Sequence, residues 1–284
     1  MNGTDQARVL MDWHIAMGID ETIAEHPVDN FAPPEPVATA APEVLRDIAP
    51  APQLTPQAAR SPATAAPVTV SPATPPPSGE ASVQSATELA AVAKTFDDLQ
   101  AALTDFDGCA LKKTATNMVF TDGNPSGRVL FIGEAPGAEE DRQGKPFVGP
   151  SGRLLDKMLA SIDLDRSQVL ISNTVFWRPP GNRTPTTIEA ATCLPFVQRM
   201  VELMMPEVIV PLGGPAAKSL LEQTTGIGKL RGRWFTYAAA NLSSSVAATP
   251  LFHPAYLLRT PAQKRAAWRD LLMIRQRLDG ADGA

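Results

Sequence analysis

The chain has 284 residues, of which 44 % are hydrophobic, and carries a formal net charge of −5 at pH 7. This composition is typical of a protein with a packed core. Its two cysteines are too few for a disulfide-stapled secreted scaffold. The sequence also contains no run of 18 apolar residues, the length that would indicate a membrane-spanning helix. Because the N-terminus also lacks a basic start followed by an apolar run, we expect a cytoplasmic protein without a membrane partner.

The charge is divided unevenly along the chain. Residues 1–90 hold 3 basic and 11 acidic side chains, a net charge of −8, whereas residues 91–284 hold 22 basic and 19 acidic side chains, a net charge of +3. A mildly basic second part suits a polyanionic partner, but many enzymes without such a partner are equally basic. The function therefore has to be read from motifs.

The N-terminal part divides into two segments that precede the main domain. Within residues 1–26, apolar residues recur at helical spacing between residues 7 and 24, which predicts a short amphipathic helix. This helix either docks on the main domain or binds an unidentified protein partner. Residues 27–85 contain 14 of the 28 prolines among Ala, Thr, Ser and Val, a composition that predicts a disordered Pro/Ala-rich linker.

The remaining residues, 86–284, have the pattern of one α/β domain. The β-prone runs are residues 128–132, 169–173, 208–212 and 247–252. Helical patterns separate these runs, one of them after Ser151 and another after Gly214. The alternation predicts a three-layer αβα fold around a central, four-stranded, mainly parallel sheet. In such sheets, sites form beyond the carboxyl ends of the strands.

The first strand runs into the segment Gly133-Glu134-Ala135-Pro136-Gly137, which predicts a sharp turn that leaves a carboxylate at the sheet edge. A solvated acidic loop is the alternative interpretation. Further along, Phe147 lies among turn residues just before the helix for which Ser151 is the expected N-cap. Its ring is a candidate stacking platform for a base, or else an ordinary part of the core.

Two more strand ends carry informative polar residues. Asn173 offers both a donor and an acceptor, the pair needed to read the edge of a pyrimidine, although it could equally cap the turn before Arg178. His253 is the only histidine of the expected domain, and Pro254 follows it directly. A lone histidine is more often structural than catalytic, but its place at a strand end favours a function.

Taken together, these motifs resemble those of the family 4 uracil-DNA glycosylases over about residues 96–275. The matching segments are 133–141, 144–155, Asn173 with 178–185, 230–234, 253–259, and 264–265 with 268–271. The resemblance implies a hydrolase that cuts the N-glycosidic bond of uracil in DNA and so starts base excision repair. The alternatives are a catalytically weak relative that binds damaged DNA and a nucleotide-processing hydrolase. We expect a monomer whose partner is uracil-containing DNA.

The resemblance also implies roles for individual residues. The residues that would line the uracil pocket are Ala135, Glu140, Phe147 and Asn173, with Phe147 stacking on the flipped-out base and Asn173 reading its edge. Glu134 stands at the position tied to catalysis, and His253 would face the uracil carbonyl oxygen. Bond cleavage leaves a uracil anion and a cationic sugar, so a donor and a carboxylate would each stabilise one charge. The residues expected to fill the gap in the duplex and contact phosphate are Tyr256, Leu257, Leu258 and Arg259.

The chain departs from the family at the cofactor. Family members usually bind a four-iron, four-sulfur cluster through four cysteines. Here Cys109 and Cys193 occupy the second and fourth ligand positions, whereas Phe106 and Trp177 stand at the first and third. Two thiolates cannot complete a cubane, which needs a ligand on each iron. We therefore expect no metal and no cofactor, with aromatic packing in place of the cluster. A cluster completed by another ligand, or a different metal, is the alternative.

Overall fold

The computed structural model describes residues 79–239, 241–242 and 244–280. The helix expected within residues 1–26 and residues 27–78 of the expected linker lie outside the described residues. The first described helix, α2 (Gly79–Val92), begins seven residues before the expected domain boundary. Residues 79–85 therefore belong to a helix and not to a linker. Ser82, Ala86 and Ala90 recur every four residues and are buried where α2 packs against α6 (Thr187–Met204).

The described residues form one six-stranded mixed sheet with the order β1-β3-β2-β4-β6-β5. The strands are β1 (Asp122–Gly123), β2 (Val129–Gly133), β3 (Val169–Asn173), β4 (Val208–Pro211), β5 (Phe235–Tyr237) and β6 (Val246–Ala248). The four inner strands are parallel, as the sequence predicts, whereas β1 and β5 pair antiparallel at the two edges. The expectation of four strands is therefore corrected to six, because the edge strands are too short to produce a recognisable alternation.

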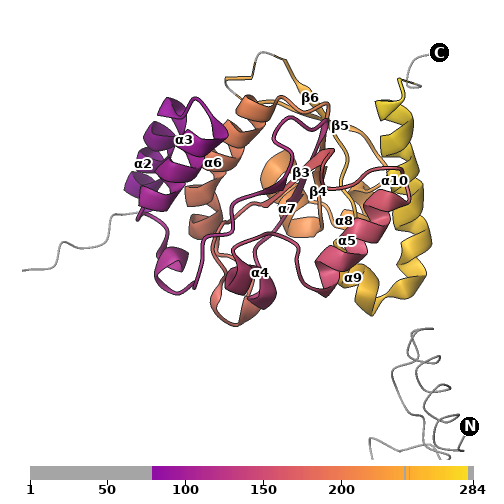
Figure 1. Ribbon diagram of the computed structural model, residues 1–284, viewed down its shortest axis with the longest axis horizontal. Helices are drawn as coiled ribbons and strands as arrows, with labels where there is room; N and C mark the ends of the chain where they lie inside the picture. Colours follow the sequence, from indigo (N-terminus) through magenta and orange to yellow (C-terminus); the bar gives the residue numbers. More distant parts are fainter. Residues whose placement is uncertain (1–78, 240, 243, 281–284) are drawn as a thin grey trace, which may run out of the picture. The chain divides into compact units, whose positions relative to one another are not determined.

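Helices cover both faces of the sheet, which is why the inner strands are apolar throughout. In β2, Leu130 and Ile132 pack into one core cluster, while Val129 and Phe131 pack into the other. Figure 1 shows α2, α3 (Phe96–Asp105) and α6 on one side of the sheet, and α5 (Pro150–Ala160), α9 (Pro254–Arg259) and α10 (Lys264–Leu278) on the other. The remaining helix bounds are α4 (Ala138–Gln143), α7 (Gly214–Leu221) and α8 (Ile227–Leu230), and the short 3₁₀ helices are η1 (Ala110–Lys113), η2 (Pro180–Asn182) and η3 (Pro261–Gln263). The three-layer αβα architecture is thereby confirmed.

The two helices predicted within residues 86–284 are present, and one of them starts differently from expectation. Helix α7 begins at Gly214 as expected. Helix α5 has Gly149 as its N-cap, with Pro150 in the first turn, so Ser151 lies inside the helix and is not its cap. Proline is favoured there because its missing N–H would have no helical partner. Within the described part of the chain, no helix has both the length and the apolar character needed to cross a membrane.

Candidate active site

A cavity of about 590 Å³ opens at the carboxyl ends of the parallel strands. The register of the sheet places Gly133 beside Asn173, and Leu212 bridges to Leu251 on the segment that leads to His253. The parallel arrangement therefore brings three strand ends to one edge. The sequence-predicted residues that line this cavity are Glu134, Ala135, Glu140, Phe147, Asn173, His253, Tyr256 and Arg259.

Part of the lining was not predicted from the sequence. Asn182, Arg183 and Thr184 reach the cavity from the loop after β3, and Gly213, Gly214 and Pro215 reach it from the start of α7. The loop residues lie within the segment 178–185 that carries the family resemblance, and this was the one signal that could have pointed to them. Gly213 has a φ of +93°. A side chain there would be strained and would meet the Cβ of His253 at 3.1 Å.

Phe147 and His253 are the two ring side chains that lie beside each other in the lining of the pocket. Their ring centroids are 5.6 Å apart, and the ring planes are inclined by 31°. Phe147 is 4 % exposed and has a φ of +53°, a left-handed conformation that costs a bulky residue roughly 1–3 kcal/mol. The ring lies directly over Gly133, where a Cβ would come within 2.7 Å of Phe147 Cζ and 2.4 Å of Asn173 Oδ1. Only glycine at position 133 lets both side chains occupy these places.

Two buried polar atoms on the pocket wall have no hydrogen-bond partner among the described residues. They are Oε1 of Glu134 and Nδ2 of Asn173. Burial raises the pKa of the Glu134 carboxyl, and a hydrogen bond with the Thr184 side chain partly opposes this shift. Buried polar atoms in native proteins nearly always have partners, and the exceptions need an explanation. A ligand that fills the pocket would supply both partners.

Glu140 contributes to the pocket in a second way besides lining it. Its Oε1 accepts hydrogen bonds from the backbone N–H groups of Val148 and Gly149, at 3.1 and 3.0 Å. The carboxylate extends from α4 and therefore holds the loop that carries Phe147. This arrangement links the acidic segment after β2 to the aromatic wall.

His253 is a neutral hydrogen-bond donor in the lining of the pocket. It is the N-cap of α9, and its Nδ1 accepts the backbone N–H of Ala255 at 3.1 Å. This hydrogen bond assigns the ring proton to Nε2. Burial, aided by the positive charge of Arg259, lowers the pKa of His253 to about 4, while the charge of Glu140 opposes the shift. The imidazole is therefore uncharged near neutral pH.

Helix α9 carries the four residues that were expected to contact DNA, but their side chains point in different directions from one another. Tyr256 and Arg259 line the cavity, and Leu258 is 42 % exposed. Leu257 is only 1 % exposed and packs in the core cluster beneath α5 and α10. The expectation is therefore wrong for Leu257, because the helical turn directs its side chain inward. The DNA contacts of the other three residues remain predictions.

The region of the missing cluster ligands is filled by protein. The Sγ atoms of Cys109 and Cys193 lie 4.0 Å apart, and both side chains are buried. Phe106 and Trp177 belong to the same core cluster, and the Phe106 ring packs 5.2 Å from Phe196. No group of three or more His, Cys, Asp or Glu side chains within the described ranges is placed to share a metal ion. The residues present here do not fit a four-iron cluster, which needs four ligands.

Comparison with known proteins agrees with the motifs and the fold. The family model described as the uracil DNA glycosylase superfamily matches residues 120–272. The type-4 uracil-DNA glycosylase of Archaeoglobus fulgidus is 40 % identical over 173 residues, which cover 59 % of this chain and 85 % of that protein. The type-4 enzyme of Sulfurisphaera tokodaii is 37 % identical over 173 residues (59 % and 78 %), and that of Thermotoga maritima is 41 % identical over 152 residues (53 % and 77 %). The chain therefore belongs to the uracil DNA glycosylase superfamily and, within it, to the type-4 (family 4) uracil-DNA glycosylases.

Proposed function

We propose that this chain removes uracil from DNA by hydrolysing the bond between the base and the sugar, and thereby starts base excision repair. One observation carries the proposal: a single cavity at the strand ends combines an aromatic ring, a neutral imidazole, and an amide and a carboxyl group that each have one buried atom without a partner among the described residues. These are the groups that base recognition and glycosidic bond cleavage require.

Asn173 and Phe147 are the groups proposed to select the base. Uracil presents a carbonyl oxygen and an N–H on its Watson–Crick edge, so the amide of Asn173 can donate to the first and accept from the second. The unpartnered Nδ2 atom of Asn173 is available for this purpose. A base must leave the duplex stack to reach such a pocket, and the Phe147 ring offers the surface on which it stacks.

His253 and Glu134 are the groups proposed to perform the chemistry. As the glycosidic bond breaks, negative charge develops on the uracil carbonyl oxygen, and the Nε2–H of His253 donates to it. A neutral imidazole keeps its proton through the reaction, which suits its pKa of about 4. The sugar becomes cationic at the same time, and a carboxylate at Glu134 stabilises this charge. A water molecule then completes the hydrolysis, because its hydroxyl adds to the sugar and its remaining proton goes to the uracil anion.

We further propose that the enzyme acts without an iron–sulfur cluster, as a monomer and in the cytoplasm. Two thiols with buried aromatic side chains beside them support packing in place of a cluster. Free cysteines suit a reducing compartment. Tyr256, Leu258 and Arg259 are proposed to contact the DNA around the flipped nucleotide, since they lie at or beside the mouth of the cavity.

Single-turnover excision tests this function with oligonucleotides that contain uracil, cytosine or thymine. We expect the parent protein to release uracil alone, and Asn173→Asp to lose uracil excision by about 10²-fold, because an acceptor replaces the side-chain donor. Asn241→Asp is the matched control, because Asn241 is an exposed residue of the turn between β5 and β6 and does not line the cavity. Binding without release would instead indicate a damage-binding relative, and hydrolysis of free nucleotides would indicate a nucleotide hydrolase.

A further inference from the structure

The segment between α4 and α5 holds Phe147 in its left-handed conformation by polar contacts on two sides. On one side, Glu140 accepts the N–H groups of Val148 and Gly149, the two residues that follow Phe147. On the other side, the carbonyl oxygens of Pro146 and Phe147 both accept from one guanidinium, that of Arg166. The peptide groups on the two sides of residue Phe147 are therefore both fixed by hydrogen bonds.

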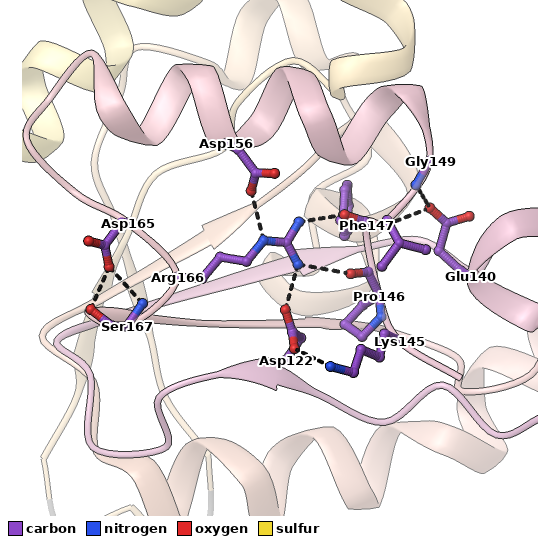
Figure 2. A network of polar contacts seen from close by, with 11 residues as sticks. Asp122, Glu140, Lys145, Pro146, Phe147, Gly149, Asp156, Asp165, Arg166 and Ser167 are labelled. Carbon is purple, nitrogen blue, oxygen red and sulfur yellow. Dashed lines mark hydrogen bonds and ion pairs between the residues drawn. The ribbon is translucent and has the colours of Figure 1, made fainter. Parts of the chain in front are cut away.

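Arg166 lies in the turn between α5 and β3 and uses three of its nitrogens for these contacts (Figure 2). Nη1 donates to Asp122 Oδ2 at 2.6 Å and to the Pro146 carbonyl at 3.3 Å, and Nη2 donates to the Phe147 carbonyl. Nε donates to Asp156 Oδ1 at 2.7 Å. Asp122 lies on the edge strand β1 and Asp156 lies on α5. The guanidinium thus joins both elements to the loop of the pocket.

The turn itself is also held. The side chain of Asp165 accepts the backbone N–H and the hydroxyl of Ser167, so the residues on both sides of Arg166 are fixed to one another (Figure 2). The side chain of Arg166 is 26 % exposed and does not line the cavity. Arg166 therefore cannot contact the base directly and can act on it only through Phe147.

Helix α5 adds a steric reason why the loop needs this polar support. At Gly152 a Cβ would come within 1.7 Å of the Phe147 carbonyl oxygen, so the carbonyl lies directly against the first turn of the helix. A carbonyl in this crowded place still needs a donor, and Arg166 supplies it. A charged, planar guanidinium can serve two carbonyls and two carboxylates at once, which lysine cannot.

We propose that Arg166 is the positioning residue of the base pocket: it holds the strained Phe147 backbone so that the ring faces the flipped base and His253. This inference rests on the proposed function of Phe147 as the stacking platform. It adds a residue that lies outside the cavity and belongs to none of the segments that carry the family resemblance. Loss of Arg166 would release strain by letting the ring leave its place over Gly133.

The test is a double-mutant cycle of Arg166→Gln and Phe147→Ala in the full-length protein, with three readouts: single-turnover excision of uracil, inhibition by free uracil, and affinity for uracil-free DNA. We expect Arg166→Gln to lower excision by about ten- to hundredfold and to weaken inhibition by free uracil, because a misplaced ring costs both binding and alignment. Affinity for uracil-free DNA should change less than about twofold, since phosphate contacts set it. In the Phe147→Ala background the same substitution should change excision less than about threefold.

Two further variants separate positioning from general stability. Arg128→Gln is the matched control, because Arg128 also pairs with a carboxylate through two nitrogens and donates to a backbone carbonyl, but its partners, Glu207 and Leu278, belong neither to the cavity nor to the Phe147 loop. It should keep the parent inhibition by free uracil. Arg166→Lys keeps the charge and should show a smaller loss than Arg166→Gln, with the same dependence on Phe147. If Arg166→Gln does not fold, the double-mutant cycle is measured with Arg166→Lys in its place.

Two results would overturn the inference: a folded Arg166 variant with the parent excision rate and uracil inhibition, or losses from Arg166 and Phe147 that multiply. The first would mean that Phe147 keeps its place unaided, and the second that Arg166 acts elsewhere. Failure of the proposed function looks different, because the parent protein would then release no uracil. The inference is judged only against an active parent.

Discussion

Replacing His253 by alanine tests the proposed chemistry most directly, because the side chain has two separable roles. Its Nε2–H is the proposed donor to the uracil oxygen, and its Nδ1 caps α9 by accepting the N–H of Ala255. Alanine removes both interactions. The loss of excision rate and the loss of folding stability can therefore be estimated separately, each from the interaction that is removed.

The two losses differ in size. Removing one donor to a developing oxyanion costs about 2.7–4 kcal/mol in transition-state stabilisation, which lowers the excision rate by roughly 10²–10³-fold. Removing an N-cap costs about 1 kcal/mol of stability, which shifts the Tm of a domain of this size by roughly 2–4 °C. We therefore expect His253→Ala to be folded at assay temperature and almost inactive.

The assay is single-turnover excision at saturating enzyme, with thermal unfolding and DNA affinity measured alongside. His253→Asn is the matched variant, because the asparagine oxygen can still cap α9 while its shorter amide does not reach the base. We expect both variants to lose excision to a similar extent, only the alanine variant to lose stability, and neither to lose DNA affinity. Excision by His253→Ala within about threefold of the parent rate would refute the role of this residue as the oxyanion donor.

The remaining predictions concern pH, packing, the cofactor and chain length. Because the pKa of His253 lies at about 4 in the folded protein, below its usual 6.5, its contribution to stability should be complete above pH 6.5 and should decline as the pH falls toward 4, a trend measurable by denaturant unfolding. The excision rate should also fall on the acid side as Glu134, whose pKa is raised, becomes protonated, and Glu134→Gln should lack this limb of the profile. Gly133→Ala should lower excision by at least about 10²-fold while far-ultraviolet circular dichroism stays at the parent level, because its Cβ displaces the ring and amide above it. Anaerobically purified protein should contain no stoichiometric iron or sulfide and no absorbance band near about 400 nm, and finding them would contradict the proposed absence of a cluster. Deleting residues 1–78 should keep excision within about tenfold of the parent rate, since the residues proposed to bind and cleave the substrate lie between Glu134 and Arg259, whereas extending the deletion through α2 should lower the Tm by uncovering α6.

The local pattern of the sequence was sufficient for the centre of the fold and for the location of the site. The apolar runs that form β2, β3 and β4 are recognisable because strands buried on both faces must be apolar throughout. The fourth predicted run, residues 247–252, overlaps β6 (Val246–Ala248) only at residues 247 and 248. Parallel strands separated by helices place their carboxyl ends at one edge, so the motifs after β2 and β3 and around His253 could be assigned to one site without coordinates. The replacement of two cluster cysteines by aromatic residues was equally visible.

Other features were decided by contacts between distant parts of the chain. The edge strands β1 and β5 have two and three residues, which is too short for any periodicity, and they exist because a neighbouring strand offers free hydrogen-bonding groups. Leu257 was expected at the DNA, but packing of α9 against α5 directs it into the core. Arg166 belongs to none of the motifs that the sequence shows. Its role follows only from the folding of a turn, an edge strand and a helix around one guanidinium, because hydrogen bonds depend on distances in space that separation along the sequence does not determine.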